Sequence, residues 1–380
     1  MATASRQQAS DTNHVWVSQP EGASNCYSDA ESQFSIVAAG DADVQNVFRV
    51  DAYSAAQAFV EGKFAVRGDL FSAIRFFSKQ PHSRARVILY SLAARLQHLK
   101  THSILGRRKE AAESIRFHYD RSNEFYAQFL DSRMVYSSAH FSRPDISLDE
   151  AQAEKLDRIC RYLELQAGDR FLDIGCGWGG LVTYAAENYG VTALGCTLSN
   201  EQLEFARGVV QRKGLAGRVS LEVCDYRDLN SAFQKIASVG MFEHVGRSRL
   251  GSYFRKAYSL LEPGGLFLNR GVIRPQGVSD DPETLFLQKS VFPGGELVHL
   301  DDVVREGERA GFEVIGVELL RKHYALTCRA WVKNLQQHAD TCRSLVGEQI
   351  YRTWLLYLAA SAVAFEDART SSAQVLFVKQ

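Results

Sequence analysis

The stretch Phe171–Gly180 reads FLDIGCGWGG and carries the clearest chemical signal in this sequence. An apolar run that ends in glycines and continues as an amphipathic segment predicts a buried strand, a tight turn and a helix. Gly175 and Gly177 would let the backbone close on a ligand. The N–H groups of the turn and of the helix N-terminus favour an electronegative group such as a carboxylate. Asp173 would hold the cationic part of the same ligand.

The segment Gly175–Gly180 also satisfies the Gly-x-Gly-x-x-Gly pattern of dinucleotide-binding folds. In those folds an Asp or Glu after the next strand binds the ribose diol of NAD. Here the next strand, expected at 191–197, runs into Thr197, Leu198 and Ser199. Together with the acidic residue before the first glycine, this favours S-adenosylmethionine over NAD as the ligand. A purely structural glycine turn is the alternative.

Further polar groups follow the next predicted strands, and the carboxyl ends of parallel strands share one edge of a sheet. Thr197 and Gln202 are expected to bond a ribose, and Asp225 with Tyr226 to border an adenine. Glu243, followed by His244, lies in an apolar, glycine-flanked strand end. A carboxylate is costly to bury there unless it is hydrogen-bonded or functional. Glu243 and His244 are therefore candidate catalytic residues, and a paired core Glu is the alternative for Glu243.

The regular alternation of strand and helix patterns from residue 169 onward positions these groups. Strands are expected at 169–174, 191–197, 218–224, 235–241, 266–273, 311–319 and 373–379, with a turn at 262–265. This alternation predicts an α/β fold with a doubly wound, mainly parallel, Rossmann-like sheet. A domain that binds S-adenosylmethionine would then span 111–380, and residues 275–310 would form an insertion that covers the substrate.

The amino-terminal part follows a different pattern. Residues 1–45 are rich in Ala, Ser, Gln and Asp without periodicity, which predicts a mobile or loosely packed arm. Residues 46–110 read as a small, mostly helical domain, with a helix at 52–60, a turn at 61–68 and a helix capped by Asp69. Residues 117–141 mix polar, aromatic and small residues without a period, which is typical of an active-site flap rather than of a core element.

Composition excludes some classes of protein. The formal net charge of zero argues against a nucleic-acid binder. Seven scattered cysteines fit reduced thiols in the cytosol better than disulfides or a metal site. No secretory signal is visible at the amino terminus, and the longest apolar run, 354–365, is too short to span a bilayer. The locally basic region 84–116 is either a solvated face or a surface for anionic lipids.

From about residue 47 to its end, the chain resembles the cyclopropane-fatty-acyl-phospholipid synthases. The motifs HYD (118–120) and EHVG (243–246) are more specific than the glycine loop. The other matching segments are Tyr136-Ser137, 172–180, 197–199, Glu201-Gln202, 225–228, 292–295, Tyr324 and Trp331. The amino-terminal segment is similar to the small lipid-associating domain of that family.

The resemblance implies methyl transfer from S-adenosylmethionine to a cis double bond of a phospholipid acyl chain. The product would be a cyclopropane or methyl-branched fatty acid. It also implies cofactor contacts from Tyr136, Ser137 and Leu198, and a peripheral membrane enzyme in the cytoplasm, for which a homodimer would be suitable. Relatives of the family methylate soluble small molecules, so a soluble acceptor is one alternative. A protein that binds lipid or cofactor without turnover is another.

In the family a bound bicarbonate is the base that closes the ring, held by a Cys, a Glu, a His and a Tyr. Glu243 and Tyr324 match two of these positions, whereas Ser138 replaces the Cys and Arg270 the His. Ser138 could still offer its hydroxyl group or its backbone N–H. Arg270 could grip bicarbonate, or it could pair with Glu243 and leave no room for the anion. The two substitutions therefore affect ring closure more than methyl transfer.

Overall fold

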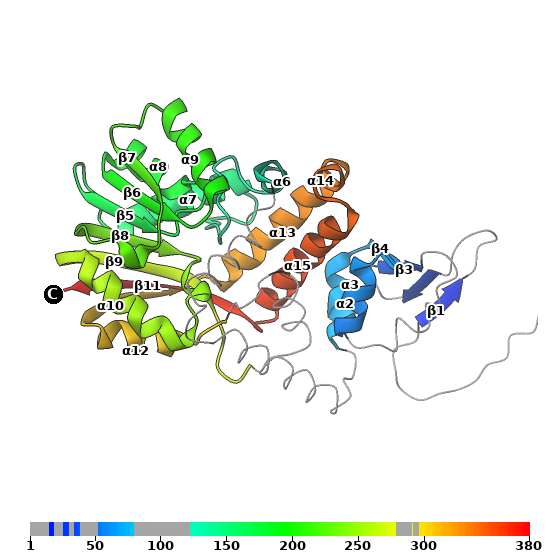
Figure 1. Ribbon diagram of the computed structural model, residues 1–380. Coiled ribbons are helices and arrows are strands. Elements are labelled where there is room, and N and C mark those ends of the chain that lie inside the picture. Colours follow the sequence, from blue (N-terminus) through cyan, green and yellow to red (C-terminus); the bar gives the residue numbers. More distant parts are fainter. Residues whose placement is uncertain are drawn as a thin grey trace, which may run out of the picture. The chain divides into compact units, whose positions relative to one another are not determined.

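The protein is described here from a computed structural model, which covers residues 15–18, 26–29, 34–38, 52–79, 122–278, 291 and 296–380 (Figure 1). The chain divides into two compact units, residues 1–82 and 83–380. Each unit is considered by itself. The HYD motif at 118–120, the basic region 84–116, the boundary expected near 110 and the segment 292–295 all lie outside the described residues.

The first unit contains a four-stranded antiparallel sheet in the order β1-β2-β3-β4. Its strands are β1 (Val15–Ser18), β2 (Cys26–Asp29), β3 (Phe34–Ala38) and β4 (Phe64–Gly68). Three of these strands lie within residues 1–45, which were expected to be a mobile or loosely packed arm. The turn expected at 61–68 is present at 61–63 and is wrong for 64–68, which form β4. The sheet includes β4, a strand that comes later in the sequence and pairs with β3 from Phe34↔Gly68 to Ala38↔Phe64.

Two helices complete this unit and agree with the sequence analysis. Helix α2 spans Ala52–Val60 and helix α3 spans Leu70–Ser78. The side chain of Asp69 accepts hydrogen bonds from the N–H groups of Phe71 and Ser72, which satisfies free donors at the start of α3. With the strands before residue 39 included, the unit is a mixed α/β domain in its described part. The part of the expected helical domain that is described, 52–79, contains α2, β4 and α3.

The second unit is built on a seven-stranded sheet in the order β10-β11-β9-β8-β5-β6-β7. The strands are β5 (Arg170–Ile174), β6 (Thr192–Thr197), β7 (Val219–Val223), β8 (Phe233–Val239), β9 (Leu261–Ile273), β10 (Phe312–Leu319) and β11 (Ser371–Lys379). Pairing is parallel from β9 to β7, and β11 is antiparallel to both of its neighbours. This confirms the predicted Rossmann-like sheet. The expected turn at 262–265 instead lies within β9, where the pairing with β8 is irregular.

Helices cover both faces of this sheet because its strands alternate between two cores. Phe171 of β5 packs with α7 (Leu148–Tyr162), α8 (Gly180–Tyr189) and α9 (Asn200–Arg212). Leu172, the next residue, packs on the other face with α10 (Leu250–Leu260) and α12 (Leu300–Arg309). Helix α12 is therefore a layer of the core, so the substrate-covering role expected for 275–310 is wrong for 300–309.

Helices α13 (Arg321–Gln337), α14 (Ala339–Val346) and α15 (Glu348–Glu366) follow β10, and α13 packs along α15 (Figure 1). Against them lies the segment that was expected to be a flap. Phe125 and Tyr126 of α6 (Asn123–Ala127) and the nearby Phe129 have no exposed surface. The flap prediction is wrong for residues 122–141, because aromatic edge-to-face packing, such as that of Phe125 on Trp354, makes this segment part of the core.

Candidate active site

A pocket of about 350 Å³ opens at the carboxyl ends of β5, β6, β7 and β8. Every residue that the sequence analysis proposed for cofactor contact lines it. These residues are Tyr136, Ser137, Asp173, Gly175, Gly177, Thr197, Leu198, Gln202, Asp225 and Tyr226, and His244 joins them. The structure thus brings together groups that are up to 108 positions apart in the sequence, from 136 to 244.

The floor of the pocket is the glycine turn after β5. Gly175 has a φ of 82°, and a Cβ atom at this position would lie 3.0 Å from Cγ of Met241. Both facts favour glycine there. Asp173 comes just before the turn and is only 3% exposed. Burial raises its pKa to about 7, although the charge of Lys155 opposes this shift. A cationic ligand group would stabilise the Asp173 carboxylate.

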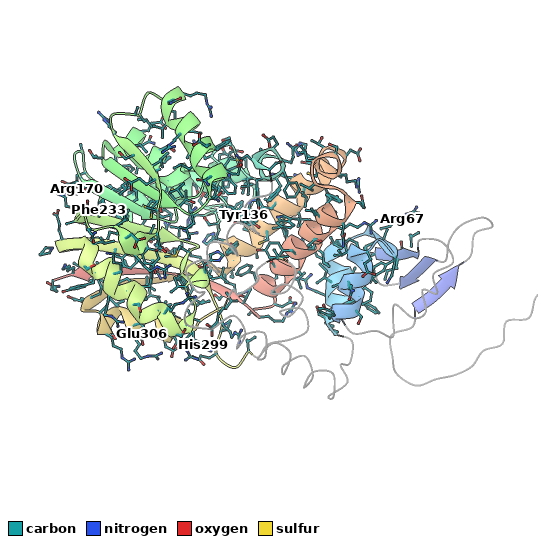
Figure 2. All side chains as sticks on the ribbon, in the orientation of Figure 1. Arg67, Tyr136, Arg170, Phe233, His299 and Glu306 are labelled. Carbon is teal, nitrogen blue, oxygen red and sulfur yellow. The ribbon has the colours of Figure 1, made fainter. Side chains whose placement is uncertain are left out.

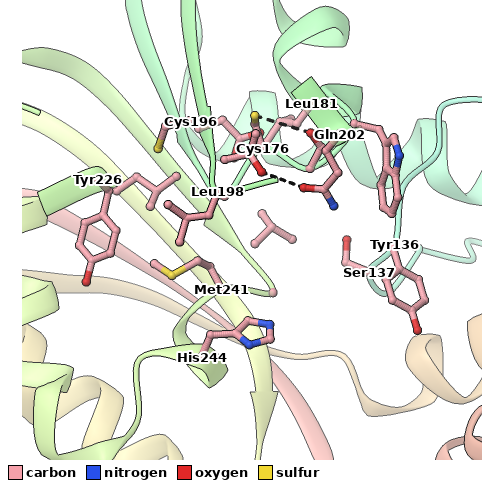
Figure 3. Close-up of a pocket in the computed structure, with 18 of the residues that line it drawn as sticks. Tyr136, Ser137, Cys176, Leu181, Cys196, Leu198, Gln202, Tyr226, Met241 and His244 are labelled. Atoms are coloured by element: carbon pink, nitrogen blue, oxygen red, sulfur yellow. Dashed lines mark hydrogen bonds between the residues drawn. The ribbon is translucent and has the colours of Figure 1, made fainter. Parts of the chain in front are cut away.

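Residues after β6 form the side of the pocket. Thr197 Oγ1 donates a hydrogen bond of 2.8 Å to Gln202 Oε1 (Figure 3). Ser199 caps α9 by accepting from the Gln202 N–H, which fixes the backbone that carries this amide. The Nε2 group of Gln202 thus keeps its donors for a ligand. The two residues expected to bond a ribose are thus a pair of side chains that are bonded to one another.

The far side of the pocket follows β7. The Asp225 carboxylate accepts hydrogen bonds from the N–H and the guanidinium of Arg227, including one of 2.8 Å from Nε. Its oxygens are thus engaged within the protein, which the sequence analysis did not anticipate. Burial raises the pKa of the adjacent Tyr226 to about 12, and its ring packs edge-on against Tyr253 at 5.7 Å. An uncharged aromatic wall of this kind suits an adenine.

The sequence analysis missed several residues of this pocket. Trp178 lines the pocket and donates from Nε1 to Asn123 Oδ1 at 2.6 Å. Tyr136, which is labelled in Figure 2, was proposed from the sequence, and its ring packs on Trp331 of α13 with centroids 5.0 Å apart. Lys155 of α7 also lines the cavity. A signal for it was present, because Gln152 and Lys155 interrupt the apolar face of an otherwise amphipathic helix. Other lining residues that were not proposed from the sequence include Met134, Val135, Cys176, Cys196, Cys224, Met241 and Arg249.

Glu243 lies in a short 3₁₀ turn, Phe242–His244, just after β8. Its Oε1 accepts a 2.7 Å hydrogen bond from the N–H of Val272 in β9. Part of the residue reaches solvent, but Oε2 is buried and has no hydrogen-bond partner within the described residues. Burial raises the pKa of Glu243 to about 7, in spite of the bond from Val272. A half-satisfied carboxyl group with this pKa can exchange a proton near neutral pH.

His244 is the neighbour of Glu243 but faces the cofactor pocket (Figure 3). Burial lowers its pKa to about 4, so the imidazole is neutral at physiological pH. Glu243 itself does not line the pocket. The turn Phe242–His244 therefore directs His244 toward the cofactor pocket and Glu243 away from it.

Arg270 and Ser138 lie together, but Arg270 does not pair with Glu243. Arg270 Nη2 donates to the carbonyl oxygens of Ser138 at 2.7 Å and Ala139 at 3.4 Å. Arg270 and Gly271 are consecutive in β9 and point to opposite faces, and the Glu243 carboxylate lies against Gly271. The sequence-based alternative of an Arg270–Glu243 pair is therefore wrong.

The remaining groups of the expected base site can be placed as well. Ser138 is buried and its hydroxyl donates to the Ala139 carbonyl. Tyr324 stacks on Phe365 with ring centroids 4.4 Å apart. Arg270 is 3% exposed, burial lowers its pKa to about 10, and its Nε has no partner in the part of the chain that is described. Glu243 Oε2 and Arg270 Nε thus both have hydrogen-bonding capacity for a ligand.

A parallel sheet with an acidic strand end, a glycine turn and an aromatic far wall defines an S-adenosylmethionine-dependent methyltransferase. Residues 106–375 match the family model described as "Mycolic acid cyclopropane synthetase". The chain belongs to this family, whose members are methyltransferases of lipid or fatty acid chains. The recognition made from sequence motifs and the cofactor S-adenosylmethionine are both confirmed.

Similar proteins agree with this assignment. A probable fatty acid methyltransferase from Pseudomonas putida is 42% identical over 330 residues, which cover 85% of this chain and 81% of that protein. Cyclopropane mycolic acid synthase 2 from Mycobacterium leprae is 35% identical over 294 residues, 71% of this chain and 95% of that one. A crystal structure of a mycolic acid cyclopropane synthase complexed with SAH and CTAB has a TM-score of 0.68 and 30% identity, and the match covers 70% of this chain and 98% of that one.

Proposed function

We propose that this protein transfers a methyl group from S-adenosylmethionine to a cis double bond in an unsaturated acyl chain of a phospholipid. The observation that carries the proposal is Glu243, a buried, half-satisfied carboxyl group beside the cofactor pocket with a pKa raised to about 7. Methylation of an amine or a hydroxyl leaves no carbocation and therefore needs no base that removes a proton from carbon. Methylation of an alkene does, because the carbocation must lose a proton.

The bound molecules supply the reacting groups, and the protein positions them. S-adenosylmethionine supplies an electrophilic methyl group on a sulfonium. The double bond attacks this methyl carbon, a C–C bond forms, the C–S bond breaks, and a carbocation is left on the chain. An alkene is a poor nucleophile, so the protein must hold the reactants in line and exclude water. Aromatic faces such as Tyr136, Tyr324 and Phe242 would stabilise the cation.

Loss of one proton completes the reaction and decides the product. A proton lost from the new methyl group with formation of a C–C bond gives a cyclopropane. A proton lost with formation of a C=C bond gives a methylene- or methyl-branched chain. Glu243 would accept this proton, either directly or through a bicarbonate bound at Glu243 Oε2, an atom with no hydrogen-bond partner within the described residues.

We further propose that the branched product is the main one. Arg270 stands where the family has a neutral imidazole, and its guanidinium is already used to hold the Ser138 and Ala139 carbonyls. A guanidinium stays charged and cannot accept a proton or a hydrogen bond, so it cannot take the place of that imidazole.

The setting proposed for this reaction is the cytoplasmic surface of a membrane, with a homodimer as the assembly. None of the described helices has the length and apolar character needed to cross a bilayer. The amino-terminal unit and the basic region 84–116 would supply peripheral contact with anionic lipids. Replacing Arg107, Arg108 and Lys109 together should weaken binding to anionic vesicles and reduce its salt dependence. Unchanged vesicle binding would assign this run to a solvated face instead.

The deciding experiment combines methyl-labelled S-adenosylmethionine with vesicles of unsaturated phospholipid, with and without bicarbonate, followed by mass analysis of the acyl chains. The proposal expects labelled methyl- or methylene-branched chains in both arms. A labelled cyclopropane that needs bicarbonate would overturn the product and restore the base site of the family. No labelled lipid would overturn the phospholipid acceptor, in favour of a soluble small molecule or of binding without turnover.

A further inference from the structure

Lys155 is a buried cation that neither the sequence motifs nor the mechanism above accounts for. It lies on the inner face of α7, is 2% exposed, and lines the pocket. Its Nζ donates a hydrogen bond of 2.9 Å to Ser137 Oγ. Burial of an ammonium group is costly unless partners or a ligand compensate for it. A lysine kept in such a place is a candidate for a functional role.

The charged groups around Lys155 leave part of its donor capacity unused. Burial lowers the pKa of Lys155 well below its usual value and Arg270 adds to this shift, whereas the carboxylates of Asp131 and Asp173 oppose it. The carboxylate of Asp131 is occupied by the N–H groups of Val135 at 2.7 Å and Arg133 at 3.1 Å. Within the described residues Nζ forms no ion pair, and Ser137 Oγ is its hydrogen-bond partner. An ammonium has three N–H donors, so donors are available toward the cavity.

The cationic side chains that line the pocket have different partners at its two ends. Tyr226 and Tyr136 lie at opposite ends of the cavity, with Leu198 and Gln202 between them (Figure 3). Of its lining cations, Arg227 pairs with Asp225 beside Tyr226, and Arg249 acts on the same tyrosine. Lys155, by contrast, is bonded to Ser137 at the Tyr136 end. An anionic group at that end would therefore meet Lys155.

We propose that Lys155 is a positioning residue for the carboxylate of S-adenosylmethionine and acts through Ser137. Because Ser137 Oγ accepts a hydrogen from Lys155, its own hydroxyl hydrogen is directed away from Lys155 and toward the cavity. The hydroxyl then donates to the carboxylate, and the ammonium charge of Lys155 stabilises the same group. Asp173, on the glycine turn, serves the cationic part of the cofactor. The protein would thus bind the carboxylate of the cofactor's amino acid end near Lys155 and its cationic part near Asp173.

The test compares two ligands that differ only in this carboxylate. Isothermal titration would measure the affinity of the full-length protein for S-adenosylmethionine and for its decarboxylated analogue, without lipid. In the Lys155→Met variant, affinity for S-adenosylmethionine should fall about tenfold or more, whereas affinity for the analogue should change less than about twofold. The Lys155→Arg variant should recover part of the preference. The Lys213→Met variant removes a surface lysine paired with Glu187 and should bind both ligands as the unmodified protein does.

A purely structural lysine predicts a different result. If Lys155 only holds the fold, Lys155→Met should weaken both ligands by the same factor, and that outcome would overturn the proposal. A preference for the carboxylate that is unchanged in Lys155→Met would overturn it as well. If a thermal unfolding measurement shows that Lys155→Met is not folded, the affinities for the two ligands are compared in Ser137→Ala instead, which keeps the lysine. Equal loss for both ligands in that variant would again contradict the proposal. Cofactor binding needs no acceptor, so these results are independent of the proposed lipid substrate.

Discussion

Gly271 of β9 provides the space that the Glu243 carboxylate occupies. A Cβ atom at position 271 would lie 2.7 Å from Oε1 and 2.8 Å from Oε2 of Glu243, and 2.5 Å from the ring of Phe242. Such distances are shorter than any contact that a real side chain makes. The position of the carboxylate therefore depends on a glycine 28 residues further along the chain.

The Gly271→Ala variant should displace Glu243 and reduce turnover by about a hundredfold, the usual contribution of a positioned base. Cofactor affinity should be unchanged, because Gly271 does not line the cofactor pocket. Turnover and titration of S-adenosylmethionine measure the two effects. The matched control is Gly316→Ala in β10, where a Cβ would make an ordinary 3.7 Å contact with Leu376. Equal activity of the two variants would show that the space at Gly271 is not needed.

The Glu243→Gln variant should abolish turnover while S-adenosylmethionine still binds. In the unmodified enzyme the rate should fall as the pH falls through about 7, because protonation of Glu243 removes the base. The expected slope is tenfold per pH unit on the acid side. A pH–rate profile of the single turnover measures this, and a profile without an acid limb would exclude Glu243 as the base. Full activity of Glu243→Gln would do the same.

Asp173 should release a proton when the cofactor binds below neutral pH. Its pKa of about 7 in the free protein means that it is largely protonated at pH 6, and a cationic ligand group favours the ionised form. Affinity should therefore rise with pH until about pH 8. Titrations in buffers of different ionisation enthalpy measure the released proton. The release should vanish at pH 9 and in Asp173→Asn, and proton uptake at pH 6 would contradict this assignment.

Replacing Ser138 and Arg270 by the Cys and His that the family has at these positions should change the product. With Ser138→Cys and Arg270→His together, we expect part of the labelled lipid to become cyclopropane, and this part should depend on bicarbonate. The reason is that an imidazole can accept a hydrogen bond where the guanidinium of Arg270 only donates. Ser138→Cys alone is the control and should keep the branched product. A double variant that still yields only branched chains would place the control of the product elsewhere.

The sequence by itself determined the sheet, the class of ligand and most of the cofactor pocket. These features depend on local pattern, since apolar runs, glycines and polar strand ends recur at fixed positions in a parallel sheet. The ten proposed cofactor residues gather in one cavity because they follow the carboxyl ends of adjacent strands or lie in the 131–139 segment beside them. The capping role of Asp69 was equally local.

Only the tertiary structure decided which side chains meet when they are far apart in the sequence. The strands within residues 15–38 form because β4 pairs with β3, which no local period reveals. The segment 122–141 is core because Trp331 and Trp354 pack against it from helices two hundred residues away. Arg270 binds Ser138 rather than Glu243 because consecutive residues of a strand face opposite sides. The tertiary structure likewise decided the environment of Lys155, because its hydrogen-bond partner Ser137 belongs to another segment of the chain.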